Sequence, residues 1–122
     1  MSLPEARLRL RMWLEMDGEQ ALGLGRAILL REVERQGSLN KAAKALGMSY
    51  RAAWGRLKKT EEVLGEHLVV EQEKGRGFTL TPHARELVEA FQEWYADVEA
   101  YAVRTAQNRF PFPVAPFESE EP

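Results

Sequence analysis

The sequence predicts a mainly α-helical fold with small β-hairpins, in the α+β class, and three observations support this prediction. Two helical segments, residues 38–46 and 49–65, are joined by a glycine turn and have the outline of a helix-turn-helix. Strand-like segments flank a turn dipeptide near the amino end and a glycine-containing loop after the helix pair. A long helical pattern starts at Thr81-Pro82 and runs to about Gln107.

Length and composition set limits on the class of protein. A chain of 122 residues suffices for one domain with a buried core and is short for two. Cysteine is absent, which excludes disulfides, thiolate nucleophiles and cysteine-based metal sites. Apolar runs such as Ala27–Leu30 are too short to cross a membrane, and the amino end has no apolar signal core. A cytoplasmic protein without a membrane partner is expected.

The amino-terminal region predicts a strand, a turn and a helix. Residues from Leu8 to Met16 alternate between apolar and mostly charged side chains, which is typical of a half-buried strand. Asp17-Gly18 supplies a hairpin turn, and a short return strand runs from residue 20 to residue 24. Helical spacing of apolar residues then continues up to Gly37, which ends the first helix.

The central region predicts two capped helices and a β-hairpin. Ser38 and Ser49 are expected N-caps, Gly47 allows the turn between the helices, and Gly65 ends the second of them. In that second helix, apolar residues at Ala53, Leu57 and Leu64 form a face for packing. Strands at residues 68–70 and 78–80, around the loop 73–77, have the shape of a wing. The central region is therefore a predicted winged helix-turn-helix.

Charge in this region points to nucleic acid. Between residues 38 and 60 there are six basic side chains and no acid, although the whole chain has a formal charge of −2. They are Lys41, Lys44, Arg51, Arg56, Lys58 and Lys59. Such a local excess indicates a phosphate-facing surface, and the major groove of DNA admits one α-helix. The predicted DNA contacts are Ser49, Tyr50, Arg51, Trp54, Arg56, Lys58 and Lys41, with Lys74 and Arg76 from the wing loop.

Several of these residues have ordinary structural interpretations as well. Trp54 fits a core position packed under the first helix as readily as a groove contact. The basic side chains of helix 49–65 could solvate an exposed helix, and the loop 73–77 could be a plain β-turn. Gly55 costs helix propensity, which makes sense if another backbone, of DNA or protein, approaches it closely. His67 and His83 are isolated, so we expect no metal and no cofactor.

The long carboxyl-terminal helix predicts a homodimer. Its apolar stripe is too aromatic to remain in water, and only its first half can pack back on a small domain. The predicted interface residues are Phe91, Trp94, Tyr95, Val98, Tyr101 and Ala102. We expect a domain of residues 1–106, with the dimerisation helix at 82–106, followed by a disordered proline-rich acidic tail at 107–122.

Three stretches together resemble a known family: WLEMDGEQALGLGR, GSLNKAAKALGMSYRAAW and LGEHLVVEQEKGRGFTLTPHAREL. They resemble the winged-helix DNA-binding domain of ModE-type molybdate-responsive regulators, which is related to the LysR-type amino-terminal domain. The resemblance implies a homodimer that regulates transcription through a recognition helix containing Ser49, Tyr50 and Arg51. The chain has no room for molybdate-binding domains, so oxyanion sensing is not expected from this sequence. Whether a separate protein supplies a sensor stays open.

Three functional hypotheses follow. The first is a dimeric, sequence-specific regulator that binds double-stranded DNA at a pseudo-palindromic operator, with half-site centres about 10 base pairs apart or a multiple of that. The second is a winged-helix module that binds protein and does not itself read DNA. The third, an enzyme, is set aside because the sequence has no catalytic motif and no convincing nucleophile with a base.

Overall fold

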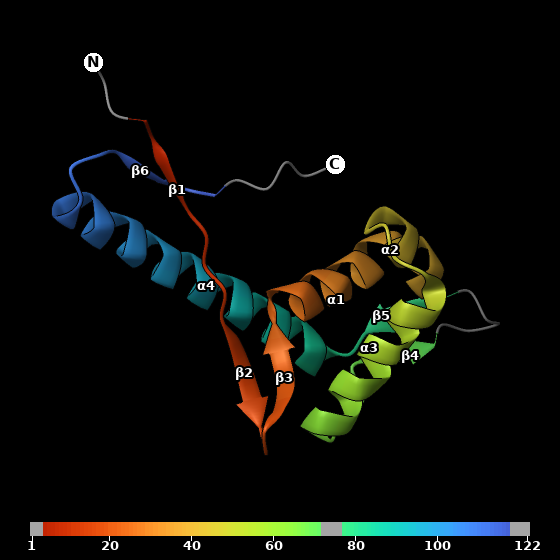
Figure 1. Ribbon diagram of the computed structural model, residues 1–122. Coiled ribbons are helices and arrows are strands. Elements are labelled where there is room, and N and C mark those ends of the chain that lie inside the picture. The colour runs from red at the N-terminus through yellow and green to blue at the C-terminus, as the bar shows by residue number, and fades with distance from the viewer. Residues whose placement is uncertain (1–3, 72–76, 118–122) are drawn as a thin grey trace. The chain divides into compact units, whose positions relative to one another are not determined.

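A computed structural model of the protein describes residues 4–71 and 77–117. The predicted fold class is confirmed, because the described chain consists mainly of helices with short two-stranded sheets. In chain order the elements are β1 (Ala6–Leu8), β2 (Trp13–Met16), β3 (Glu19–Gly23), α1 (Leu24–Gln36), α2 (Leu39–Ala45), α3 (Tyr50–Leu64), β4 (Val69–Glu71), β5 (Phe78–Leu80), α4 (Pro82–Arg109) and β6 (Val114–Pro116). Figure 1 shows their course.

The chain forms two compact units. One is Met12–Gln92, and the other combines Met1–Arg11 with Glu93–Pro122. Helix α4 begins in the first unit and continues into the second. This division differs from the single domain of residues 1–106 that the sequence suggested.

The helix boundaries in the first unit follow the predicted caps. Ser38 Oγ accepts a hydrogen bond from the Lys41 amide at 3.0 Å, and Ser49 Oγ accepts one from the Ala52 amide at 3.0 Å. These bonds satisfy amides that have no partner inside a helix. Gly37 and Gly65 end α1 and α3 with φ angles of 76° and 72°, a conformation that favours glycine. Local chemistry therefore fixes where α2 and α3 start and where α1 and α3 stop.

The core of the first unit lies where α1, α2 and α3 meet, beside the β2–β3 and β4–β5 hairpins (Figure 1). Its largest fully buried side chains are Leu30, Val33, Leu39, Leu57 and Leu68. Ala42 and Ala43 of α2 are also buried, and their small side chains let α2 pack closely. Helix α3 is thus held from the inside by apolar contacts, and its other face is exposed.

The predicted amino-terminal strand is two separate strands. β2 pairs antiparallel with β3 around the turn at Asp17 and Gly18, as expected, with Trp13 opposite Gly23. β1, by contrast, pairs in parallel with β6 at the other end of the chain, with Ala6 opposite Val114. The alternation before residue 12 thus belongs to a different sheet from the alternation after it. A sequence pattern of period two does not identify the partner of a strand.

In the second unit, α4 residues from Glu93 onward accompany the β1–β6 pair. Of the segment 107–122, expected to be disordered, the structure describes residues 107–117, which contain β6, and Val114 is buried. Gln107 Nε2 donates to the Val114 carbonyl at 2.6 Å, and the Arg9 guanidinium lies 3.6 Å from the centre of the Phe117 ring. These contacts give the tail a place to pack despite its prolines.

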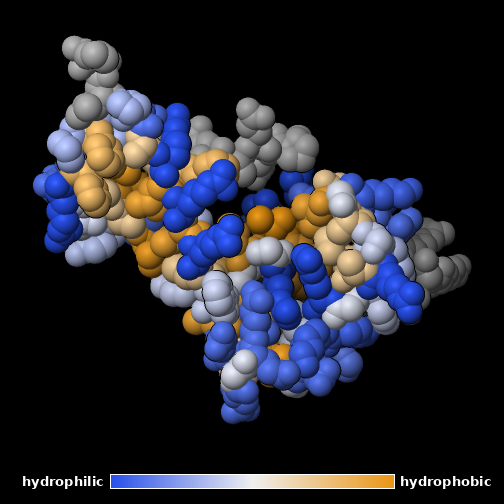
Figure 2. All heavy atoms as spheres, viewed as in Figure 1, coloured by the Kyte–Doolittle hydropathy of each residue, from blue (hydrophilic) through white to orange (hydrophobic). Residues whose placement is uncertain are grey.

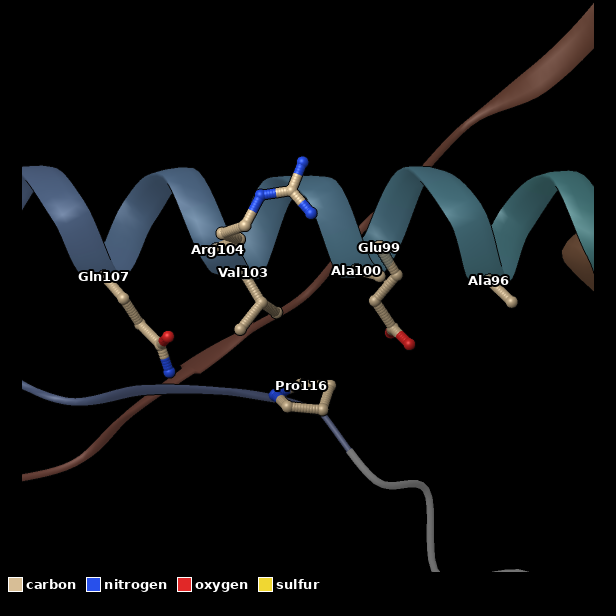
Figure 3. A pocket seen from close by; sticks show the side chains of 7 residues that line it. All are labelled: Ala96, Glu99, Ala100, Val103, Arg104, Gln107 and Pro116. Atoms are coloured by element: carbon tan, nitrogen blue, oxygen red, sulfur yellow. The ribbon is translucent and has the colours of Figure 1, made fainter.

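A shallow groove of about 320 Å³ lies between α4 and β6. Figure 3 shows Gln107, Val103 and Glu99 pointing from α4 toward the segment that carries Pro116, whereas Arg104 points away from it. Gln107 is already bonded to the β6 backbone. The groove therefore results from how β6 lies on the helix.

No helix in the described residues is long and apolar enough to cross a membrane.

The wing, defined here as β4, β5 and the loop between them, is tied to α1 by Glu34. This carboxylate accepts hydrogen bonds from the Leu80 amide at 2.9 Å, from Thr79 Oγ1 at 3.3 Å and from Arg85 Nε at 2.8 Å. The main-chain bond from Leu80 is the largest cause that lowers the pKa of Glu34, and the Arg85 guanidinium adds to it against the effect of burial. One side chain thus joins α1, the wing and α4.

We expect the Glu34→Gln variant to be less stable than the wild type by about 1 kcal/mol at pH 7, because charge-assisted hydrogen bonds become neutral while solvent screens part of the effect. The lowered pKa makes the carboxylate stabilising above its unfolded pKa of about 4.3. That advantage is lost as the pH falls through the folded-state pKa. Urea unfolding between pH 7 and pH 3 measures it, and a difference that does not shrink below pH 4.3 would contradict the assignment.

Candidate nucleic-acid interface

The amino-terminal end of α3 is open to solvent. Ser49, Tyr50 and Arg51 are all exposed, and Tyr50 keeps 49% of its surface. Since Ser49 caps the helix through its own side chain, its hydroxyl is already engaged with the Ala52 amide. Arg51 extends from the first turn, where recognition helices present base-contacting side chains. The structure therefore places the three residues together at one end of the helix.

The inward face of α3 carries a feature that the sequence analysis missed. Ala53 and Leu57 are buried as expected, but Glu61 is buried as well, with 8% of its surface exposed. Its carboxylate accepts from the Leu68 amide at 2.8 Å and from Lys58 Nζ at 3.2 Å. Glu61 stands four residues after Leu57, so the helical period could have placed it on the core side. It holds the start of the wing against α3.

The predicted basic residues fall into two groups. Exposed side chains that can face a phosphate backbone are Lys41, Lys44, Arg51, Arg56 and Lys58. Lys59 instead forms an ion pair with Glu19 of β3 at 2.8 Å, and this hydrogen bond is the largest cause that raises the pKa of Lys59. Lys59 therefore contributes to holding the β2–β3 hairpin on α3. Figure 2 shows hydrophilic side chains gathered over this hairpin and the nearby end of α3.

Behind the exposed face, a buried link connects α1 to α3. Arg26 Nη1 donates to Thr60 Oγ1 at 2.7 Å, and Thr60 Oγ1 donates to the Arg56 carbonyl at 2.7 Å. Burial lowers the pKa of Arg26, and the positive charge of Arg56 lowers it further. The link fixes the helix backbone from which Arg56 projects.

Trp54 is neither a core tryptophan nor a free one. It keeps 38% of its surface and is stacked on Tyr50, with ring centroids 6.4 Å apart and an interplanar angle of 13°. The Phe78 ring of β5 lies tilted against it at 6.4 Å, and Lys58 Nζ lies 4.4 Å from the centre of the Trp54 ring. Trp54 is therefore not a core tryptophan packed under α1, and its contact with a DNA groove stays a prediction.

Two further predicted DNA contacts belong to the loop between β4 and β5. Lys74 and Arg76 lie outside the described residues. Next to them, Gly77 adopts a φ of +108°, and a Cβ added there would overlap the carbonyl oxygen of Gly37. The neighbouring Phe78 amide donates to that same oxygen at 3.1 Å. β5 thus begins directly against the end of α1.

Gly55 lies on the exposed side of α3. A Cβ added there would meet nothing within 4 Å among the described residues. No backbone of the described chain therefore approaches Gly55 closely, and the free space faces solvent. A partner that approaches this position remains a prediction.

The predicted dimer residues of α4 differ in how far they are buried. Phe91 is buried with 2% of its surface exposed, so the prediction that it faces a partner is wrong, because the chain itself covers it. Tyr95 is half-buried and its hydroxyl donates to the Leu10 carbonyl at 3.2 Å. Val98 and Ala102 are half-buried, whereas Trp94 and Tyr101 keep 38% and 60% of their surfaces. The solvent-facing part of the stripe is therefore centred on Trp94 and Tyr101.

The two histidines each lie near a carboxylate of the same chain. His83 Nε2 lies 2.8 Å from Glu66 Oε2, and His67 Nδ1 lies 3.9 Å from Glu61 Oε2. Among the residues that the structure describes, no group of three or more His, Cys, Asp or Glu side chains could hold a metal ion. His83 links the start of α4 to the segment that follows α3, whereas His67 lies near a carboxylate of α3.

Comparisons with known proteins agree with this geometry. The family model of bacterial regulatory helix-turn-helix proteins of the lysR family matches residues 25–85. The chain is 38% identical over 89 residues to the molybdenum transport protein ModE of Azotobacter vinelandii, which covers 70% of this chain and 33% of that protein. It is 33% identical over 81 residues to the molybdenum-pterin-binding protein MopB of Rhodobacter capsulatus, with 64% and 30% covered. The chain thus spans about a third of the length of these curated relatives.

Solved structures show the same fold. The CbnR DNA-binding domain in complex with DNA superposes with a TM-score of 0.59 at 20% identity, covering 70% of this chain and 97% of that chain. The BenM DNA-binding domain in complex with benA site 1 DNA gives a TM-score of 0.59 at 18% identity, with 74% and 99% covered. The matched segment contains α2, α3 and the wing, and the ModE resemblance seen in the sequence is confirmed. The chain belongs to the LysR family of bacterial regulatory helix-turn-helix proteins, a family of DNA-binding transcription regulators.

Proposed function

We propose that this protein is a homodimer that binds double-stranded DNA sequence-specifically in the cytoplasm and thereby regulates transcription. The observation that carries the proposal is the exposed face of α3, where Tyr50 and Arg51 stand at the amino-terminal end and no acid occurs between residues 38 and 60. An exposed helix with this charge fits the width and the potential of the major groove. The solved complexes of the CbnR and BenM domains with DNA support the same assignment.

The residues take different roles in this proposal. Arg51 reads a base edge, since a guanidinium can bond two acceptors of guanine at once. Lys41, Arg56 and Lys58 contact phosphates, which positions the helix without reading sequence. Because the whole chain has a formal charge of −2, the attraction to DNA depends on this local surface. Binding should therefore weaken steeply with salt, by about 0.9 in log affinity per log salt for each phosphate neutralised.

Selection of bound duplexes from a random pool tests the proposal directly. We expect enrichment of a pseudo-palindromic site whose half-site centres are about 10 base pairs apart, or a multiple of that spacing. Enrichment of an asymmetric site would contradict the dimeric arrangement. If no duplex is retained even at low salt, the protein-interaction module becomes the better description.

Two substitutions should separate base reading from phosphate contact. Arg51→Ala should cost about 1–3 kcal/mol on the selected site and little on mixed-sequence duplex, so that the ratio between them falls. Lys41→Ala should weaken both duplexes alike and reduce the salt slope by about 0.9. Fluorescence anisotropy titrations over a salt series measure both quantities. Equal behaviour of the two variants would remove Arg51 from base recognition.

The dimer is tested on the open part of the α4 stripe. Tyr101→Asp should shift the protein from dimer to monomer at micromolar concentration, because a charge would be buried without a partner at a symmetric contact. Ala96→Asp, on the other side of the same helix, is the matched control and should leave the dimer intact. Sedimentation velocity gives the answer, and a wild-type monomer would exclude this interface.

A further inference from the structure

A row of side chains runs along the exposed face of α3. Tyr50, Trp54 and Lys58 follow one another at intervals of four residues, which brings successive side chains into contact on a helix. The Tyr50 and Trp54 rings are nearly parallel, and the Lys58 ammonium lies 4.4 Å from the centre of the indole. The indole is thus the central member, in contact with both of the others.

The indole is fixed from outside the helix by the wing. Phe78, the first residue of β5, lies against Trp54 at a centroid distance of 6.4 Å and an angle of 31°. Its own amide is bonded to the Gly37 carbonyl at 3.1 Å, so the position of Phe78 is set by the backbone at the end of α1. Tyr50 and Phe78 therefore restrict the rotamer of Trp54 before any partner binds.

The fixed Trp54 ring in turn restricts the position of the Lys58 ammonium. Its ammonium is shared between the Trp54 ring and the Glu61 carboxylate at 3.2 Å, and 45% of its side chain is exposed. A lysine on an open helix samples many rotamers and loses that freedom on binding. A ring that attracts the cation keeps it near one position at the helix surface. Glu61 is buried, so it holds the other side of the ammonium from within the fold.

We infer that Trp54 is a positioning residue for DNA binding, which holds the Lys58 ammonium in place for a phosphate and makes that position depend on the wing strand through Phe78. Trp54 is partly exposed, but the Lys58 ammonium already lies over its ring. In this inference the ring therefore does not stack on a base itself. The inference rests on the proposed function, since it assigns to Trp54 a role in the same phosphate contact.

A double-mutant cycle tests the inference. The variants are Trp54→Leu, Lys58→Met and the pair, with Trp54→Phe as the conservative variant and Trp13→Leu, an exposed tryptophan of β2, as the matched control. Affinities for the selected duplex and for mixed-sequence duplex are measured over a salt series. We expect Trp54→Leu to weaken binding by about three- to fivefold. Lys58→Met should reduce the salt slope by about 0.9 in the wild-type background and by clearly less in the Trp54→Leu background.

Trp54→Phe should recover most of the affinity, because a phenyl ring also attracts the cation, and Trp13→Leu should bind as the wild type does. In the free protein, the ε-methylene protons of Lys58 should show an upfield ring-current shift that Trp54→Leu removes. The inference would be overturned if the losses of binding free energy in the double-mutant cycle were additive. It would also be overturned if Trp54→Phe and Trp54→Leu lost equal affinity, or if the wild type showed no upfield shift of the Lys58 protons. If the wild type bound no duplex at all, the proposed function itself would fail.

Discussion

Replacing Gly77 with alanine is expected to lower the unfolding free energy by about 3 kcal/mol, which makes it one of the two largest effects we predict. The residue has a φ of +108°, in a region that side chains other than glycine rarely adopt. The new Cβ would also overlap the Gly37 carbonyl oxygen, to which the Phe78 amide donates. Strain and the lost main-chain bond therefore add, at about 1–3 and about 1 kcal/mol.

Thermal unfolding followed by circular dichroism measures this effect, which should lower Tm by about 10–20 °C for a protein of this size. Gly55→Ala is the matched control, because its Cβ meets nothing within 4 Å and the position lies inside α3. It should raise stability by about 0.5–1 kcal/mol through helix propensity. A Gly77→Ala variant as stable as the control would mean that the wing strand does not depend on this close approach.

Leu57→Ala is expected to cost about 3 kcal/mol, because it leaves a cavity at the centre of the first unit. Leu57 keeps 1% of its surface and is the largest side chain of α3 to be fully buried. The cost includes both the lost apolar transfer energy and the cavity that the surrounding helices fill only in part.

Leu64 provides a control of identical chemistry on the same helix. It is half-buried at the last turn of α3, so Leu64→Ala should cost about 1 kcal/mol. Urea unfolding curves distinguish the two variants through their midpoints, with the same slope m for both. Similar midpoints would show that the core is not centred on Leu57.

The helix-turn-helix was predictable from the sequence because its boundaries are set by local chemistry. Ser38 and Ser49 cap their helices through bonds within three residues, and Gly37 and Gly65 end helices by their own backbone conformation. The exposed basic face followed from counting charges over one segment. Each of these signals is complete within a few residues of sequence.

Most of the missed features depend on partners far away in the chain. β1 pairs with a strand more than a hundred residues later, and Lys59 pairs with Glu19, forty residues earlier. The spacing from Leu57 places Glu61 on the core side of α3, but it does not show that Leu68 and Lys58 satisfy its oxygens. The roles of Trp54 and Phe78 likewise exist only once α3 and the wing meet. The local sequence pattern predicts a helix or strand, whereas the residues that it contacts depend on the tertiary structure.

Gly37 shows what such a contact achieves. This residue ends α1, precedes the cap of α2, and supplies the carbonyl oxygen to which the second wing strand, β5, is bonded. The spacing between the helix pair and the wing is consequently dictated by peptide groups at one junction. Side chains around it can therefore change without altering the separation between the helix pair and the wing. A relative with a different operator could therefore arise by exchanging surface residues on an unchanged frame.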